Sequence, residues 1–102
     1  MENEQITQKI RYFLDDSGRL AVYPAKFKKR ILVLTYLASK FNAQRSYTEN
    51  EVNELLQLWH VFDDWAMLRR ELCDYHFLRR SDDGTNYWLE EQQPTLESFN
   101  LS

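Results

Sequence analysis

The sequence predicts an α+β domain, a mostly helical winged helix-turn-helix with a small C-terminal β-hairpin and an extra N-terminal helix. Apolar residues recur at helical spacing in four segments, and the third and fourth are joined by only a few residues, as in a helix-turn-helix pair. Asp83-Gly84, a strong hairpin signal, separates two short strand-like stretches. We expect an N-terminal helix and extension over 1–24, a winged-helix core over 25–89 and an acidic C-terminal tail over 90–102.

The first helix is expected over residues 6–14, where apolar residues recur every three or four positions. A turn follows it and contains Gly18, which can take the left-handed conformation that closes a helix end. Residues 19–23 are predicted to be extended, because Pro24 keeps Tyr23 out of the α region.

The strongest helix is predicted over residues 25–41. It is apolar on most sides, so we expect it at the centre of the core. Its first turns carry Lys26, Lys28, Lys29 and Arg30, a placement that opposes the helix dipole. A positive helix start suggests an anionic partner, although simple solvated lysines are the commoner explanation.

The helix-turn-helix pair is predicted from two cap patterns. A short strand at 46–47 leads into Thr48 to Glu51, which fits a capping box for a helix over 49–59. Asp63 or Asp64 then caps a helix over 64–75. On this second helix Arg70 lies nearly opposite the apolar face, and Arg69 lies at the boundary. Hairpin strands are expected over 77–80 and 86–89.

Composition indicates one domain in a reducing compartment. The 102 residues suit one modest core. The lone cysteine, Cys73, excludes an intrachain disulfide and a thiolate zinc site, so we expect a cytoplasmic protein. No stretch approaches the ~20 consecutive apolar residues of a membrane span. The acidic N-terminus lacks a signal-peptide pattern, and we expect no membrane association.

Charge is spread unevenly along the chain. The net charge of −3 argues against strong non-specific binding to polyanions. Residues 17–48 nevertheless contain seven basic residues and no acid, whereas residues 49–102 contain twelve acids and four arginines. The asymmetry predicts a local basic surface, provided that the fold brings these basic residues together.

Several stretches of the chain together resemble a known family, the bacterial domain of unknown function numbered 2087. They cover residues 18–88 and include KFKKRILVLTYLASKF, RSYTENEVNELL and DDWAMLRRELCDYHFLRRSDDGTNYW, in that order. Family members occur alone or attached to transcription-regulator domains, which implies a regulatory setting. The family pattern usually has glycine after the LRREL-D-Y helix; this chain has His76, and His tolerates left-handed geometry better than most residues. The resemblance implies no catalytic residues.

Enzyme chemistry finds little support, so we expect a non-enzymatic protein without metal or cofactor. The paired aspartates at 15–16, 63–64 and 82–83 fall at predicted turns or caps, where Asp bonds nearby backbone N–H groups. His60 and His76 lie at opposite ends of one helix, roughly 24 Å apart at 1.5 Å per residue, too far to share a metal. With two glycines in the chain, a glycine-rich phosphate loop is excluded.

The first functional hypothesis is binding to double-stranded DNA. The second helix of a helix-turn-helix pair is the one presented to the major groove, so Arg70, and with it Arg69, would meet base edges or phosphates. The hairpin and the basic start of helix 25–41 would hold the phosphate backbone. The predicted nucleic-acid-binding residues are Lys26, Lys28, Lys29, Arg30, Arg69, Arg70, Arg79 and Arg80.

The second hypothesis is a protein-interaction or homodimerisation module, because a fold alone does not fix function. An outward-facing Met67 and Cys73 are expected to be available to a partner. The tryptophans also suit an interface, although core packing is their commoner role. The sequence offers no stacking motif for RNA and no pocket pattern for a small effector. Four acids predicted beside the DNA contacts favour this second hypothesis: Glu71, Asp74, Asp82 and Asp83.

Overall fold

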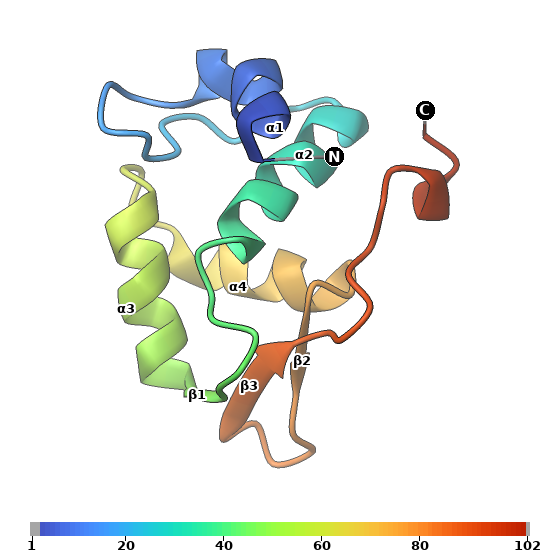
Figure 1. Ribbon diagram of the computed structural model, residues 1–102. Helices are drawn as coiled ribbons and strands as arrows, with labels where there is room; N and C mark the ends of the chain where they lie inside the picture. Colours follow the sequence, from blue (N-terminus) through green and yellow to red (C-terminus); the bar gives the residue numbers. More distant parts are fainter. Residues whose placement is uncertain (1–2, 102) are drawn as a thin grey trace.

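A computed structural model describes residues 3–101 of the chain (Figure 1). Within that range the domain is α+β, with four α-helices and three short strands. No helix of this range is long and apolar enough to cross a membrane. The elements in chain order are α1 (Asn3–Ile10), the 3-10 helix η1 (Arg11–Phe13), α2 (Phe27–Ala38), β1 (Tyr47–Thr48), α3 (Glu49–Trp59), α4 (Trp65–Asp74), β2 (Leu78–Arg80), β3 (Asn86–Leu89) and the 3-10 helix η2 (Glu97–Phe99).

The three strands form one antiparallel sheet in the order β1-β3-β2. β2 and β3 are the predicted hairpin, which projects at the bottom of Figure 1. In its register Arg80 pairs with Tyr87, and Arg79 pairs with Trp88. Tyr87 is buried and faces the helices, and successive residues of a strand point to opposite faces. Arg80 therefore lies on the helix side of the sheet, and Arg79 lies on the outer side.

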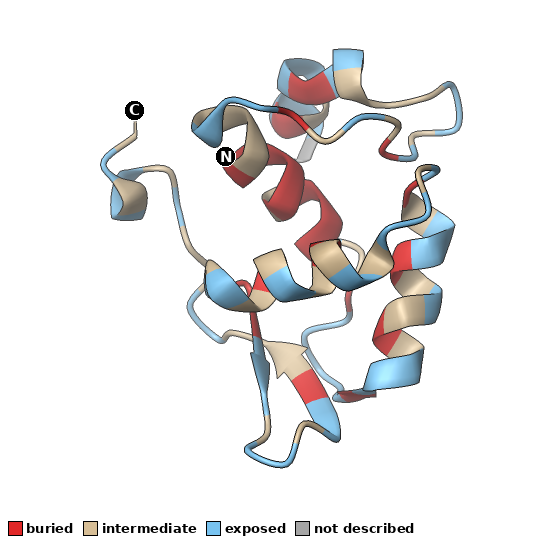
Figure 2. Cartoon of the chain, turned by 180° about the vertical axis from the view of Figure 1, so that it is seen from behind, coloured by how far each residue is buried: buried red, intermediate tan, exposed pale blue. Residues whose placement is uncertain are grey.

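Helix α2 occupies the centre of the core, as its apolar composition predicts. Figure 2 shows most of this helix as buried, and its residues 31–34 and 36–38 are all at most 6% exposed. α1 packs along it on one side, and α4 packs on another. The helix is shorter than predicted. Lys26 is in extended conformation and precedes it, and at its other end Ser39 and Lys40 form a turn.

The caps predicted for α3 and α4 are both confirmed. The Thr48 side chain accepts a 3.2 Å hydrogen bond from the Glu51 N–H, while a Glu51 carboxylate oxygen accepts a 2.8 Å bond from the Thr48 N–H. Asp64, rather than Asp63, caps α4 by accepting from the Met67 N–H at 3.2 Å. Asp63 instead takes the left-handed conformation in the connection, with φ of 61°.

The predicted left-handed positions are also confirmed. Gly18 has φ of 80° and closes the turn that follows the first helix. That helix begins earlier than predicted, and its predicted last residues form the 3-10 helix η1 instead. His76 has φ of 69° directly after α4 and its C-cap Tyr75. A histidine therefore holds the backbone geometry for which glycine is the usual residue.

The C-terminal segment, residues 90–101, packs back on the domain. It runs from β3 to the start of α2 (Figure 1). The Phe99 ring meets those of Phe27 and Tyr75 edge-on, with centroids 5.8 and 6.1 Å away. The Gln93 side-chain amide donates to the Phe77 carbonyl at 2.9 Å. We call this segment the tail; its contacts link the start of α2 to the end of α4.

Candidate nucleic-acid interface

Helix α4 presents Arg70 to solvent. Leu68 and Leu72 are fully buried on its inner side, so helical geometry places Ala66, Arg70 and Asp74 on the exposed side. Arg70 forms no hydrogen bond or ion pair within residues 3–101. A cation that carries no internal contact and lies at the middle of an exposed helix face is free to meet an external anion.

Arg69 has a structural role instead. Its guanidinium donates to the Asn53 side-chain oxygen and lies 3.8 Å from a Glu49 carboxylate oxygen. That Glu49 oxygen also accepts a 3.0 Å hydrogen bond from the Tyr87 hydroxyl. The Arg69 side chain is only 22% exposed. Its charge is therefore largely balanced where α4, α3 and β3 meet.

The two hairpin arginines are separated by strand alternation. Arg79, on the outer side, lies with Nε 3.6 Å from a Glu90 carboxylate oxygen. Arg80, on the helix side, lies near the Cys73 thiol and the Tyr87 hydroxyl: burial raises the pKa of both groups, and the Arg80 guanidinium partly offsets that rise. Arg80 thus lies beside α4, on the same side of the hairpin as Arg69. Arg79 and Arg80, both predicted to contact phosphate, therefore lie on opposite faces of the sheet.

The basic start of α2 lies away from the hairpin, although its Phe27 ring meets the Tyr75 ring at the end of α4, with centroids 5.5 Å apart. Both views place this start at the opposite end of the molecule from the hairpin turn (Figures 1 and 2). Lys29 Nζ donates to the Lys9 carbonyl at 3.1 Å, and Arg30 Nε donates to the Pro24 carbonyl at 3.0 Å. Lys26 is exposed, and Lys28 lines a groove between the tail and the helices α1 and α2. The eight predicted residues are therefore divided between opposite ends of the molecule, with α4 between the start of α2 and the hairpin turn.

The remaining basic residues of 17–48 do not extend either group, because they are engaged locally. Arg19 pairs with Asp15 at 3.1 Å, and Arg45 pairs with Glu51 at 2.8 Å. Lys40 Nζ lies 4.1 Å from the centre of the Trp59 ring, a cation–π contact, and burial lowers its pKa. The basic stretch of the sequence is thus spread over the domain rather than gathered on one surface.

Two of the four acids expected beside the DNA contacts are held by internal hydrogen bonds. A Glu71 carboxylate oxygen accepts a 2.9 Å bond from the Tyr23 hydroxyl, and burial raises the pKa of that hydroxyl. Asp83 Oδ1 accepts from Ser81 and Thr85 in the hairpin turn, which lowers the pKa of Asp83 to about 2. Asp74, and Asp82 beside Asp83, remain exposed.

Two residues expected to face outward are only partly accessible. Met67 is half-buried and packs against the core. The part of the α4 surface that contacts the rest of the domain is therefore wider than the single apolar stripe of the sequence predicts. Cys73 is also half-buried, and its burial raises the pKa of the thiol. The prediction that Met67 is exposed is wrong, and Cys73 is a poor nucleophile in this setting.

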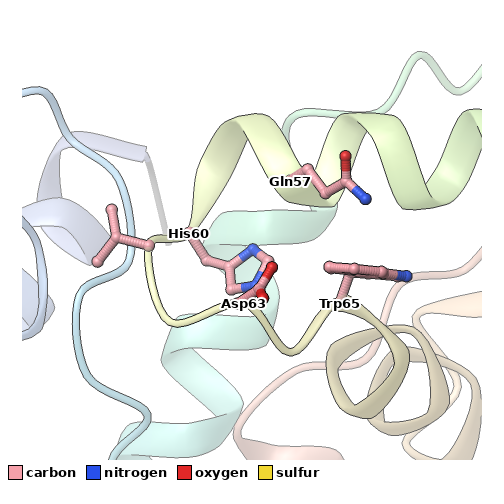
Figure 3. A pocket seen from close by; sticks show the side chains of 5 residues that line it. Gln57, His60, Asp63 and Trp65 are labelled. Atoms are coloured by element: carbon pink, nitrogen blue, oxygen red, sulfur yellow. The ribbon is translucent and has the colours of Figure 1, made fainter.

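A shallow surface pocket of about 500 Å³ lies at the turn between α3 and α4 (Figure 3). His60 lines it, but both ring nitrogens are engaged: Nδ1 lies 2.5 Å from the Leu56 carbonyl, and Nε2 accepts from the Asp64 N–H at 2.9 Å. The ring is therefore the tautomer that carries its proton on Nδ1. Among residues 3–101 no group of three or more histidine, cysteine or acidic side chains is arranged to hold a metal.

The comparisons with known proteins define a family but no activity. A sequence model of uncharacterized proteins conserved in bacteria, DUF2087, matches residues 19–89. The match covers most of the chain, so the protein belongs to this family. No curated protein and no solved structure matches it.

The sequence reasoning missed two features of the surface. One is the pairing of Arg69 with Glu49 and Asn53, which lie on another helix. The other is the groove that the tail forms with α1 and α2. Neither has a local sequence signal, because each depends on how distant segments pack.

Proposed function

We propose that this protein is a non-enzymatic DNA-binding domain of winged helix-turn-helix type that acts in transcription regulation. The observation that carries the proposal is Arg70, exposed and without an internal partner in the described chain, on the second helix of the α3–α4 pair. The order α2, β1, α3, α4, β2, β3 and the sheet order β1-β3-β2 suit a winged helix, in which the β2–β3 hairpin is the wing.

The contact surface in this proposal is smaller than the sequence suggests. α4 would enter the major groove with Arg70 at base edges or phosphates, and Arg80 would reach phosphate from the hairpin. Arg69 would orient α4 from its contacts with α3. The basic start of α2 lies at the other end of the molecule and would not take part. With about two or three phosphate contacts, the logarithm of the association constant for DNA should fall linearly with the logarithm of the salt concentration, at a slope of roughly −2 to −3.

The test is fluorescence anisotropy of a labelled random duplex, titrated with the protein at low and moderate salt. We expect salt-sensitive binding that Arg70→Ala weakens about fivefold or more. Lys26→Ala is the matched control, because it removes one exposed positive charge immediately before α2, whose start lies away from the hairpin turn. No binding even at low salt, or equal losses for the two variants, would overturn the proposal.

A second candidate function, a protein-interaction or dimerisation module, is favoured by one surface. Leu58 is 69% exposed and Val61 is 45% exposed, where α3 ends. Val61 lines the pocket of Figure 3 together with Trp65. If this surface binds a second copy, Leu58→Ser should lower the sedimentation-derived mass at high protein concentration, and Arg70→Ala should leave it unchanged.

A further inference from the structure

The pocket of about 500 Å³ at the turn between α3 and α4 has a composition that points to a ligand (Figure 3). The described residues that line it are Gln57, His60, Val61, Asp63 and Trp65. One of them, Asp63, is acidic, and none is a lysine or an arginine. Because the pocket is shallow, it suits a side chain that projects from another molecule better than a small ligand that must be enclosed.

Two polar side chains of this pocket have no partner inside the described part of the domain. The Asp63 carboxylate and the Gln57 amide form no hydrogen bond or ion pair within residues 3–101, and both residues are exposed. His60 differs, because the Leu56 carbonyl and the Asp64 N–H engage both nitrogens of its ring. The His60 ring is therefore part of the wall, whereas Asp63 and Gln57 are available to a ligand.

The end of α3 adds to the negative potential of the pocket, because the last carbonyls of a helix lack intrahelical partners. The Val61 N–H, which would bond the Gln57 carbonyl if the helix continued, donates to the Leu20 carbonyl instead. α3 has no basic residue in its last turn. The partly positive start of α4 is met by its own cap, Asp64, which accepts a backbone hydrogen bond there. Together the two helix ends favour a cation beside Asp63.

Trp65 selects among cations. In Figure 3 its ring is seen edge-on, so that one face of the ring is turned towards Gln57. Of the aromatic side chains, tryptophan attracts a cation most strongly to its face. A guanidinium is planar, stacks on such a face and bonds a carboxylate through two N–H groups, whereas an ammonium is a compact, strongly hydrated charge. Arginine therefore fits this combination of groups better than lysine.

The pocket is bordered by exposed apolar side chains. Leu58 is 69% exposed, and Val61, which lines the pocket, is 45% exposed. We call these two residues the Leu58 surface. An apolar residue of a partner, next to its arginine, would remove this surface from water.

We propose that the pocket binds an arginine side chain of a protein partner. Its guanidinium would lie on the Trp65 ring and bond the Asp63 carboxylate, and an apolar neighbour of that arginine would cover the Leu58 surface. The inference does not rest on DNA binding, because no pocket residue is a proposed DNA contact. It names a different partner for the surface on which the second candidate function places a second copy.

The probe is a capped peptide in which one arginine lies between two leucines, titrated into ¹⁵N-labelled protein and followed by NMR. We expect saturable shifts at the Trp65 indole N–H and at the Gln57 side-chain amide. Citrulline in place of the arginine keeps the shape and removes the charge. It should weaken binding about tenfold, since both the ion pair and the cation–π contact are lost. A lysine peptide should bind at least about twofold less tightly than the arginine peptide.

Asp63→Asn tests the carboxylate. It should weaken binding of the arginine peptide about three- to fivefold, the scale of one exposed ionic contact, and leave binding of the citrulline peptide unchanged. Asparagine tolerates the left-handed backbone that Asp63 adopts, with φ of 61°, so the variant should fold normally. Asp82→Asn is the matched control, because it removes the same charge from an exposed aspartate outside the pocket.

Four results would overturn the proposal. Three concern the peptides: shifts that do not saturate, equal affinity for the arginine and citrulline peptides, or an equal loss of affinity in Asp63→Asn and Asp82→Asn. The fourth is a shift of the Trp65 indole signal with protein concentration when no peptide is present, because the Leu58 surface would then bind a second copy. Since no DNA is present, these outcomes are independent of whether the domain binds a duplex.

Discussion

A guanidinium nitrogen of Arg69 lies 3.8 Å from a carboxylate oxygen of Glu49, which joins α4 to the start of α3. The same oxygen accepts the hydrogen bond from Tyr87, so one carboxylate connects two helices and the central strand. The next residue along α4, Arg70, has no such contact in the described chain. Adjacent arginines of one helix thus have different roles, because a rotation of about 100° separates their side chains.

The first prediction separates these two roles. Arg69→Ala should lower the free energy of unfolding by about 1 kcal/mol, since it removes a charged hydrogen bond that is partly screened by solvent. Arg70→Ala should change it by less than about 0.5 kcal/mol, as is usual for an exposed side chain. Urea denaturation followed by tryptophan fluorescence measures both. Equal destabilisation by the two substitutions would contradict the assignment of Arg69 as structural.

The second prediction concerns the turn at Gly18. Its φ of 80° disfavours other residues, and an added Cβ would lie 3.2 Å from the Tyr36 hydroxyl oxygen, which donates to the Gly18 carbonyl at 2.6 Å. Gly18→Ala should therefore lower the free energy of unfolding by about 1–2 kcal/mol. Gly84→Ala is the control: its φ is 74°, but a Cβ there meets no atom within 4 Å. Gly84→Ala should be the milder change, and the reverse order would exclude the Tyr36 contact as a cause.

Local sequence signals predict the elements of this fold well. The capping box at Thr48 and Glu51 specifies the start of α3 because both partners lie within one helical turn. Asp83-Gly84 likewise specifies the hairpin, whose return strand β3 spans 86–89 as predicted. The central position of α2 follows from its apolar composition on nearly every side. Each of these features is decided by residues close together in the chain.

The functional surface is harder to predict, because charge runs do not show which side chains meet. Lys29 and Arg70 are equivalent in a count of cations, yet one donates to the Lys9 carbonyl and the other is exposed. The position of the tail is also a tertiary property, since Phe99 contacts residues more than twenty positions earlier in the chain. These contacts depend on the assembled core.

The third prediction tests the attachment of the tail. Phe99 is half-buried and makes edge contacts with two rings, so Phe99→Ala should lower the free energy of unfolding by about 1–2 kcal/mol. The backbone amide of Leu101, which donates to the Leu96 carbonyl at 2.9 Å, should exchange its hydrogen faster. NMR-detected hydrogen exchange measures this change. Unaltered exchange at Leu101 would mean that Phe99 does not hold the tail.

The fourth prediction is a pH dependence from the hairpin turn. Side-chain hydrogen bonds from Ser81 and Thr85 lower the pKa of Asp83 from 3.8 to about 2. Because the folded-state pKa is the lower one, the ionised carboxylate stabilises the fold above about pH 4, and this contribution is lost as the pH falls towards 2. The stability difference between wild type and Asp83→Asn should therefore be constant near neutral pH and shrink over that acid range.

The neighbouring Asp82 provides the control for this pH dependence. It is exposed and forms no hydrogen bond within residues 3–101, so Asp82→Asn should leave the acid dependence of stability close to that of wild type. Chemical denaturation at a series of pH values between about 2 and 7 compares the three proteins. If Asp83→Asn kept the same stability deficit at pH 2 as at pH 6, the ionised carboxylate would not be the stabilising group. The turn would then be held by hydrogen bonds that do not involve the carboxylate of residue 83. One of these is the 3.1 Å bond that the Ser81 hydroxyl accepts from the Asn86 N–H.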